Sequence, residues 1–217
     1  MNVTPSASVS APRIGRSFQR RPRQRGATLL ELMIGLAVII FIMVVVLIGM
    51  RSLNDQLDRS ALLRYAPQIK MNIAGMREGL DLKQLTTPNA VALGAFPAEI
   101  VVGTGVDAIV KNPFGGKIFA NGTTATIGRV DVGQGFALSF TEIPTSQCAG
   151  VVRGLAPMAQ GIWVDDVATP ASLAAAPAND AVVMDPASTI GIELVKLAKV
   201  CSPNDAKTVS VHALMKI

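Results

Sequence analysis

One uncharged apolar run dominates the pattern of hydrophobic and polar positions. It extends from Leu32 to Met50, nineteen residues without a charged side chain. Counted from Ala27, the stretch has 24 residues, or roughly 36 Å of helix at about 1.5 Å per residue. This length spans the hydrocarbon core of a bilayer, so the sequence predicts a transmembrane helix. An ordinary signal-peptide core has only about 7–15 residues, and no small-residue cleavage site follows this run, so we expect it to be retained.

The helical pattern continues beyond the apolar run. Apolar side chains recur about every four residues as far as residue 80, with polar and charged side chains between them, which predicts an amphipathic helix. Pro67 lies inside this stretch and is expected to kink or interrupt it. We therefore predict one long, bent helix over about 27–79, whose second half packs one face on a globular domain. The apolar stripe consists of Leu53, Leu57, Ala61, Tyr65, Ile69 and Ile73.

After Gly79 the pattern changes to short strands and turns, which makes the chain α+β. The segments 117–120 and 123–127 flank Asn121-Gly122, a pair typical of a two-residue hairpin turn. The Ala/Pro-rich residues 162–184 are expected to form loops with short strands. Further strands are predicted at 99–102, 134–143 and 207–215, and helices at 144–154 and 186–200.

The positive charge of the chain is concentrated at its N-terminus. The net charge is +5, but residues 1–26 contain six arginines and no acid, which leaves 20 − 6 = 14 basic and 15 acidic residues, a formal −1. The basic character is therefore no argument for nucleic-acid binding, which needs a basic patch on the folded part. Alone, such a tail would be a solvated, disordered segment. Because this tail precedes an apolar span, its arginines indicate the orientation in the membrane: they stay in the cytoplasm and the C-terminal part lies outside.

A short motif marks the junction between the arginine-rich segment and the apolar run. Gly26 is followed by A-T-L-L-E at 27–31. This pattern resembles the class III signal of type IV prepilins, and the chain is most similar to type IVb major pilins of the PilS kind. The resemblance implies that a prepilin peptidase cuts between Gly26 and Ala27 and that Ala27 is N-methylated. Ala27 departs from the family, where type IVa pilins have Phe and many type IVb pilins have Met or Leu.

The same resemblance implies a fold and a division of the chain. We expect the type IV pilin fold, a long N-terminal helix packed on an antiparallel sheet, with a disulfide-closed C-terminal region. Residues 1–26 would be a cleaved leader. Residues 27–52 would form the transmembrane, filament-core half of the helix, and residues 53–217 a periplasmic or extracellular globular head.

Glu31 is the charged residue near the start of the predicted span. A carboxylate inside a membrane helix costs on the order of a few kcal/mol and usually has a partner. In a stack of subunits, that partner would be the α-amino group of a neighbour's residue 27, and the pair would set the axial register of the helices. The alternative is that Glu31 lies at the membrane boundary and extends to the headgroups.

Two further segments are similar to type IVb pilins. They are N-P-F-G-G at 112–116 and P-T-S-Q-C at 144–148. Cys148 and Cys201 both follow the apolar span, so an exported domain would place them in an oxidising compartment, where only one pairing is possible. In the family this pair closes the C-terminal region. The alternative is two free, buried thiols.

No other residues in the sequence predict a catalytic, metal or cofactor site. His212 lies in a predicted strand, and no Ser/Asp or Cys arrangement near it suggests a triad, so we expect a surface histidine or one with its hydrogen bonds satisfied. Residues 103–105 lack the Lys-Ser/Thr of a phosphate loop and are expected to form a turn. The acidic pair at 165–166 is expected to be solvated. The Asn121-Gly122-Thr123 sequon is better explained by the predicted turn.

The resemblance implies a structural subunit rather than an enzyme, with no cofactor. The chain would wait in the bacterial inner membrane as a single-pass precursor and then polymerise into an extracellular pilus for adhesion, aggregation or conjugative contact. Its partners would be other copies of itself, prepilin peptidase and the assembly machinery of the inner and outer membranes. The alternatives are a minor pilin or type II secretion pseudopilin, and a signal-anchored membrane protein with a receptor or enzyme head.

Overall fold

A computed structural model of the chain describes residues 28–76, 81–166, 180–188, 191–202 and 206–217. The predicted leader and the Gly26–Ala27 junction lie outside these residues. The chain falls into two compact units, residues 1–46 and 47–217, which are called the N-terminal and C-terminal units below and are described separately.

The helix α1 extends over Leu29–Gly75, as the apolar and amphipathic patterns together predict. It continues through Pro67 rather than being interrupted there. Within the C-terminal unit, its buried positions recur at intervals of three or four residues, with Tyr65 and Ala66 side by side, which places them on one face of the helix. Leu53 and Leu57 of the predicted stripe are exposed, because strict four-residue spacing winds around the helix. The buried residues are Leu62, Tyr65, Ala66, Ile69 and Ile73.

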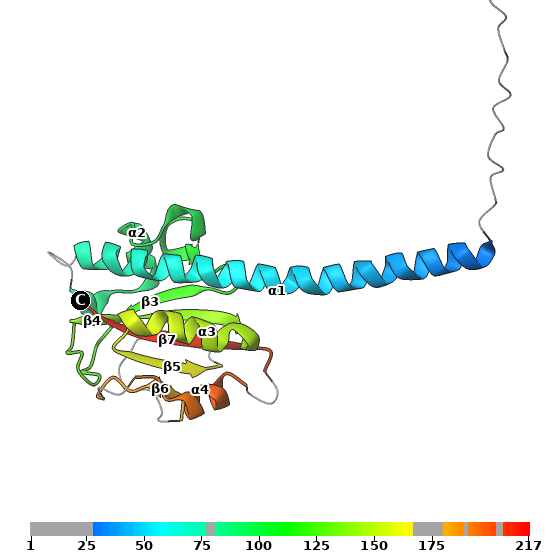
Figure 1. The fold of residues 1–217 in the computed structure, drawn as a ribbon. Helices are drawn as coiled ribbons and strands as arrows, with labels where there is room; N and C mark the ends of the chain where they lie inside the picture. The colour runs from blue at the N-terminus through cyan, green and yellow to red at the C-terminus, as the bar shows by residue number, and fades with distance from the viewer. Residues whose placement is uncertain (1–27, 77–80, 167–179, 189–190, 203–205) are drawn as a thin grey trace, which may run out of the picture. The chain divides into compact units, whose positions relative to one another are not determined.

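A five-stranded antiparallel sheet forms the centre of the C-terminal unit, with the strand order β3-β4-β7-β5-β6 (Figure 1). The last strand of the chain, β7, therefore lies between β4 and β5. The predicted strands at 134–143 and 207–215 are confirmed as two neighbours in this sheet. The bounds are Ile118–Gly122 for β3, Gly135–Pro144 for β4, Gly161–Asp165 for β5, Val182–Met184 for β6 and Thr208–Lys216 for β7.

Both faces of this sheet are covered by apolar side chains. Alternate residues of a strand point to opposite faces, and β4 shows the alternation clearly. Phe136 and Leu138 belong to the large core cluster that also contains the buried face of α1, whereas Ala137 belongs to a smaller cluster with Trp163. The predicted packing of the long helix on an antiparallel sheet is therefore confirmed.

The helix α3, Thr145–Leu155, confirms the helix predicted at 144–154 and packs closely on α1. Two glycines one turn apart make this approach possible. A Cβ at Gly150 would overlap the side chain of Arg59, and a Cβ at Gly154 would overlap that of Leu63. These α1 residues are four positions apart, so the contact follows one face of each helix.

The predicted hairpin at Asn121-Gly122 is wrong. Both residues belong to β3, and the partner of β3 is β4 rather than residues 123–127. The glycine is required for another reason: its backbone N–H donates to the carbonyl of Leu85 at 2.9 Å, and a Cβ there would overlap the carbonyl of Leu82. Gly122 is therefore required because a second segment of the chain approaches it closely, and not because a tight turn needs a glycine there.

Shorter elements complete the C-terminal unit. The strand predicted at 99–102 is reduced to β1, and the helix predicted at 186–200 is reduced to α4, while residues 167–179 of the predicted loop region lie outside the described residues. The remaining elements are η1 (Leu82–Gln84), α2 (Thr87–Ala92), η2 (Ala98–Ile100), β1 (Val101–Val102), η3 (Gly105–Asp107), β2 (Ile109–Val110), η4 (Ala156–Met158) and α4 (Leu194–Val200).

Candidate functional site

The first part of α1 presents an apolar surface on every side. The stretch Leu29–Leu47 has 19 residues, a mean hydropathy of 3.0 and none of its window buried. The core helix of a soluble protein can be equally apolar, but it would be largely buried. An exposed apolar helix of this length suits a bilayer or contact with other apolar helices.

Glu31 is the one charged residue among positions 28–50 of this helix and is exposed. Its backbone N–H donates to the Thr28 side-chain Oγ1 at 3.4 Å and to the Thr28 carbonyl at 2.9 Å. Thr28 therefore caps the helix, and T-L-L-E has the spacing of a capping box. This local role was not predicted, although the T-L-L-E pattern is present in the sequence. A carboxylate in the first turn is also favoured by the helix dipole.

A shallow groove on the surface of α1 begins at Glu31. Its volume is about 310 Å³, and its lining continues through Gly35 to Ile39. Gly35 follows Glu31 by one turn, so both lie on one side of the helix, and a Cβ at Gly35 would meet no atom within 4 Å. Small residues of this kind allow the backbone of a second helix to approach closely in an apolar environment.

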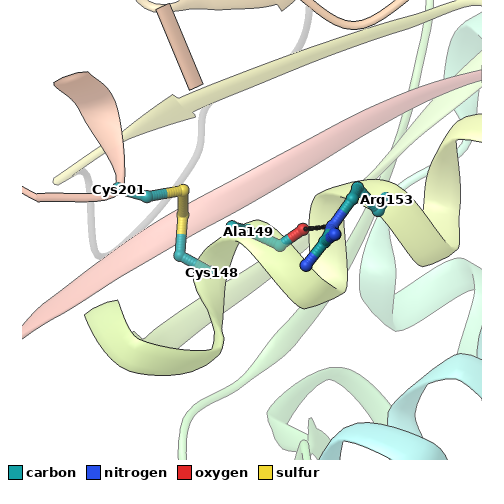
Figure 2. Close-up of a disulfide and its surroundings, with 4 residues drawn as sticks. All are labelled: Cys148, Ala149, Arg153 and Cys201. Atoms are coloured by element: carbon teal, nitrogen blue, oxygen red, sulfur yellow. Dashed lines mark hydrogen bonds between the residues drawn. A yellow bond between two sulfur atoms is a disulfide. The ribbon is translucent and has the colours of Figure 1, made fainter. Parts of the chain in front are cut away.

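The predicted disulfide is present and links α3 to the end of α4 (Figure 2). Cys148 and Cys201 have Cα atoms 5.5 Å apart and are separated by 53 residues in sequence. Both are buried, so the alternative of two free thiols is wrong. A loop of this size corresponds to stabilisation on the order of 4 kcal/mol in the chain-entropy model. The bond closes the segment that contains β5, β6 and α4.

The N-P-F-G-G segment at 112–116 is a turn held by the buried side chain of Asn112. The Asn112 side-chain Oδ1 accepts from the backbone N–H groups of Phe114 at 2.9 Å and Gly116 at 3.2 Å, and its Nδ2 donates to the Thr141 carbonyl at 2.6 Å. Gly115 has a φ of 94°, and a Cβ at Gly116 would overlap the Thr141 carbonyl. This motif therefore directs the chain into β3 and exposes no reactive group.

His212 lies in a polar cluster that the sequence analysis did not find. Its Nδ1 lies 2.7 Å from the Ser139 Oγ, and its Nε2 lies 2.9 Å from the Asp165 Oδ1. Its ring stacks on Trp163 with centroids 5.4 Å apart. The expectation that no Ser/Asp arrangement lies near His212 is wrong, because β4, β7 and β5 bring together residues that are 73 and 47 positions apart.

The geometry of this cluster is structural rather than catalytic. Ser139 and His212 are each 1% exposed, so a substrate cannot reach the hydroxyl. The histidine instead satisfies its two ring nitrogens inside the sheet, which agrees with one of the two environments predicted for it. Among the residues that the structure describes, no group of three or more His, Cys, Asp or Glu side chains could hold a metal ion.

No family model and no curated protein matches the chain. Among solved structures, it is similar to a type IV b pilin from Salmonella typhi, with 20% identity, coverage of 71% of this chain and 97% of that chain, and a TM-score of 0.47. It is also similar to TcpA, a type IV pilin from Vibrio cholerae El Tor biotype, with 16% identity, coverage of 72% and 98%, and a TM-score of 0.49.

Proposed function

We propose that this chain is a type IV prepilin of the IVb group, and that the mature chain is a structural subunit of a pilus. The observation that carries the proposal is the apolar span Leu29–Leu47, which is exposed throughout and contains one charge, Glu31. The same helix continues into a disulfide-closed α+β unit. In a membrane precursor that becomes a filament, lipid would cover the apolar span first and other copies would cover it later. The α+β unit would remain outside the membrane throughout.

Processing between Gly26 and Ala27 by prepilin peptidase is consistent with the start of α1. The helix is capped by Thr28, so the cut would leave an α-amino group one residue before the cap. A positive group at a helix N-terminus is unfavourable, because it faces the positive end of the dipole. A nearby carboxylate offsets this cost, and Glu31 lies in the first turn. In a filament, the carboxylate of one subunit would pair with the methylated amine of Ala27 in a neighbour.

In the proposed filament, the apolar spans of many copies form the core. An unpaired carboxylate in such a core is strongly penalised, so pairing at Glu31 would fix the axial register. The groove from Glu31 to Ile39 offers a place where a neighbouring helix could approach. The assembly machinery of the inner and outer membranes would move the subunit from the membrane into the extracellular pilus, where it would serve adhesion, aggregation or conjugative contact.

The decisive experiment is the intact mass and N-terminal sequence of the full chain, expressed in a host that contains a prepilin peptidase and the matching pilus assembly machinery. We expect a chain that begins at a methylated Ala27 and is abundant in sheared filaments. An intact Met1, or cleavage after about residue 50, would contradict the proposal. A processed chain that is scarce in sheared filaments would instead indicate a minor pilin or a pseudopilin.

Glu31→Val separates processing from assembly. We expect this variant to be cleaved normally but to lose most filaments, and Glu31→Asp to retain part of them because the charge is kept. Normal filaments from Glu31→Val would show that no register pair is needed.

A further inference from the structure

Two lysines face each other beside the edge strand β3. Lys111 and Lys117 are directly opposite in an antiparallel bridge, which places their side chains on one face with Cβ atoms about 4.5–5.5 Å apart. Both side chains are exposed, and among the residues that the structure describes neither forms an ion pair. Like charges in this arrangement are destabilising. An anion bound between the two ammonium groups would offset that repulsion.

A groove beside β3 includes Lys117 in its lining. Its volume is about 340 Å³, which is large enough for a small ligand. Alternate residues of a strand point to the same face, so Phe119 lies on the face of Lys117 and Ile109 lies on the face of Lys111. Phe119 is half-buried, Ile109 is 39% exposed, and both line the groove. The lysine pair therefore lies next to an apolar surface that contains an aromatic ring.

Asp107 adds a carboxylate to the same groove. It lines the groove and is exposed, and it forms no ion pair with any residue that the structure describes. Asp107 precedes Lys111 by four residues, a backbone span of at most about 14 Å at about 3.5 Å per residue. One groove therefore presents both signs of charge within reach of a single small ligand, and the carboxylate does not neutralise Lys117 across it.

We propose that this groove binds the phosphocholine headgroup of a lipid bilayer. The phosphate would lie between Lys111 and Lys117, and the trimethylammonium group would lie against Asp107 and the ring of Phe119. Aromatic rings recognise quaternary ammonium groups through their negative faces. The methyl groups of choline also suit the aliphatic wall at Val106, whereas a primary ammonium has three N–H donors that need acceptors. A zwitterion of this kind matches both charges of the groove, which a simple anion or cation does not.

Exposed aliphatic side chains beside the groove favour a headgroup in a membrane over phosphocholine free in solution. Val102 is directly opposite Ile109 in the pair of β1 and β2, so the two side chains share a face. Val102 is 49% exposed and Val106 is 81% exposed, which is more apolar surface than one small solute would cover. Exposed apolar patches of this kind mark interaction sites, including sites for membranes. This inference rests on the proposed function, because it assigns a surface through which a filament would adhere to a cell.

Titration of the full chain in maltoside micelles with phosphocholine tests the site without requiring filaments. By isothermal titration calorimetry we expect one phosphocholine to bind per chain. Inorganic phosphate and choline should each bind at least about tenfold more weakly, because each of them contacts only one part of the groove. The absence of phosphocholine binding, or equally strong binding of inorganic phosphate, would overturn the inference.

Substitutions in the groove test which residues bind the two charges. Lys117→Gln and Asp107→Asn should each weaken phosphocholine binding by at least about fivefold, because each removes a contact between opposite charges. Phe119→Leu keeps an apolar side chain but removes the ring, and it should weaken binding by about threefold. Lys199→Gln and Asp131→Asn are matched controls that should bind as the wild type does, since both residues are exposed and lie outside the groove. Unchanged binding in Lys117→Gln and Asp107→Asn would overturn the assignment.

Flotation of sheared filaments with lipid vesicles tests the bilayer as the source of the headgroup. We expect filaments to float with phosphatidylcholine vesicles and to be released by free phosphocholine, and Asp107→Asn should reduce flotation by at least about fivefold. Equal flotation with phosphatidylglycerol vesicles that is insensitive to Asp107→Asn would reduce the site to a lysine pair on an anionic surface and overturn the inference. Binding of phosphocholine in micelles without flotation would overturn the bilayer as its source. A wild-type chain that never enters filaments would overturn the proposed function, while the titration in micelles would still decide whether the groove binds phosphocholine.

Discussion

The two halves of α1 have the same backbone structure but opposite surroundings. In the N-terminal unit, every described side chain from Thr28 to Val46 is exposed, and nearly all of them are apolar. In the C-terminal unit, the helix buries one face, from Leu62 to Ile73, against the core. One half of this continuous helix gains stability by packing within the chain, whereas the proposed function assigns the cover of the other half to lipid or to other chains.

The largest expected effect is on the half of α1 that packs within the chain. Leu62→Ala removes a side chain that is 0% exposed, so it should lower the free energy of unfolding by about 2–5 kcal/mol. Leu57→Ala is the matched control, because Leu57 is 66% exposed on the same helix, and should change stability by less than about 0.5 kcal/mol. Urea-dependent proteolysis of the full chain in membranes measures both. Equal losses of stability in the two variants would mean that the side chain of Leu57 is also buried.

The next effect concerns the half of α1 that needs an apolar environment. Ile39→Arg should cost about 2.5–3.5 kcal/mol on insertion into a bilayer, because a charged side chain would lie near the middle of the span. Leu57→Arg should insert normally, because it lies beyond the predicted span. Alkaline extraction of membranes, followed by quantification of the retained chain, distinguishes the two. Retention of Ile39→Arg at the wild-type level would argue against a transmembrane helix.

Glycine substitutions give a third comparison of the two units. Gly122→Ala should destabilise the C-terminal unit by about 1–3 kcal/mol, because the added Cβ would overlap the backbone carbonyl of Leu82, which cannot rotate away. Gly35→Ala meets no atom within 4 Å and should stabilise the helix by up to about 1 kcal/mol. If a neighbouring helix approaches at Gly35, this variant should nevertheless yield fewer filaments. Thermal unfolding and filament yield, measured together, test both statements.

The two glycines also show where prediction from sequence succeeded and where it failed. Local sequence patterns predicted α1, β4, α3 and β7 close to their actual bounds. Gly122 was assigned to a turn, because a sequence does not reveal that a second segment passes close to a glycine. The contacts of His212 with Ser139 and Asp165 were missed for a related reason, since they depend on the strand order of the sheet.

The features of the candidate site were also predicted only in part. The exposed apolar helix was predicted from the local sequence, and the disulfide between Cys148 and Cys201 was expected from the resemblance to type IVb pilins. The exposure of individual apolar side chains was not predicted, because exposure is a property of the folded unit. Val195 and Leu197 are two residues apart in one short helix and have the same apolar character, yet one is 85% exposed and the other 4%.

The smallest expected effect concerns the cap of α1. Thr28→Ala removes the Oγ1 that accepts the Glu31 N–H, so it should weaken the first turn by about 1 kcal/mol. Thr28→Ser keeps the oxygen and should behave as the wild type. Hydrogen exchange at the amides of Leu30 and Glu31, measured in micelles, should be about fivefold faster in Thr28→Ala, since 1.4 kcal/mol corresponds to a factor of about 10. If exchange is unchanged while Glu31→Val still loses filaments, the carboxylate acts between subunits and the cap plays no part in assembly.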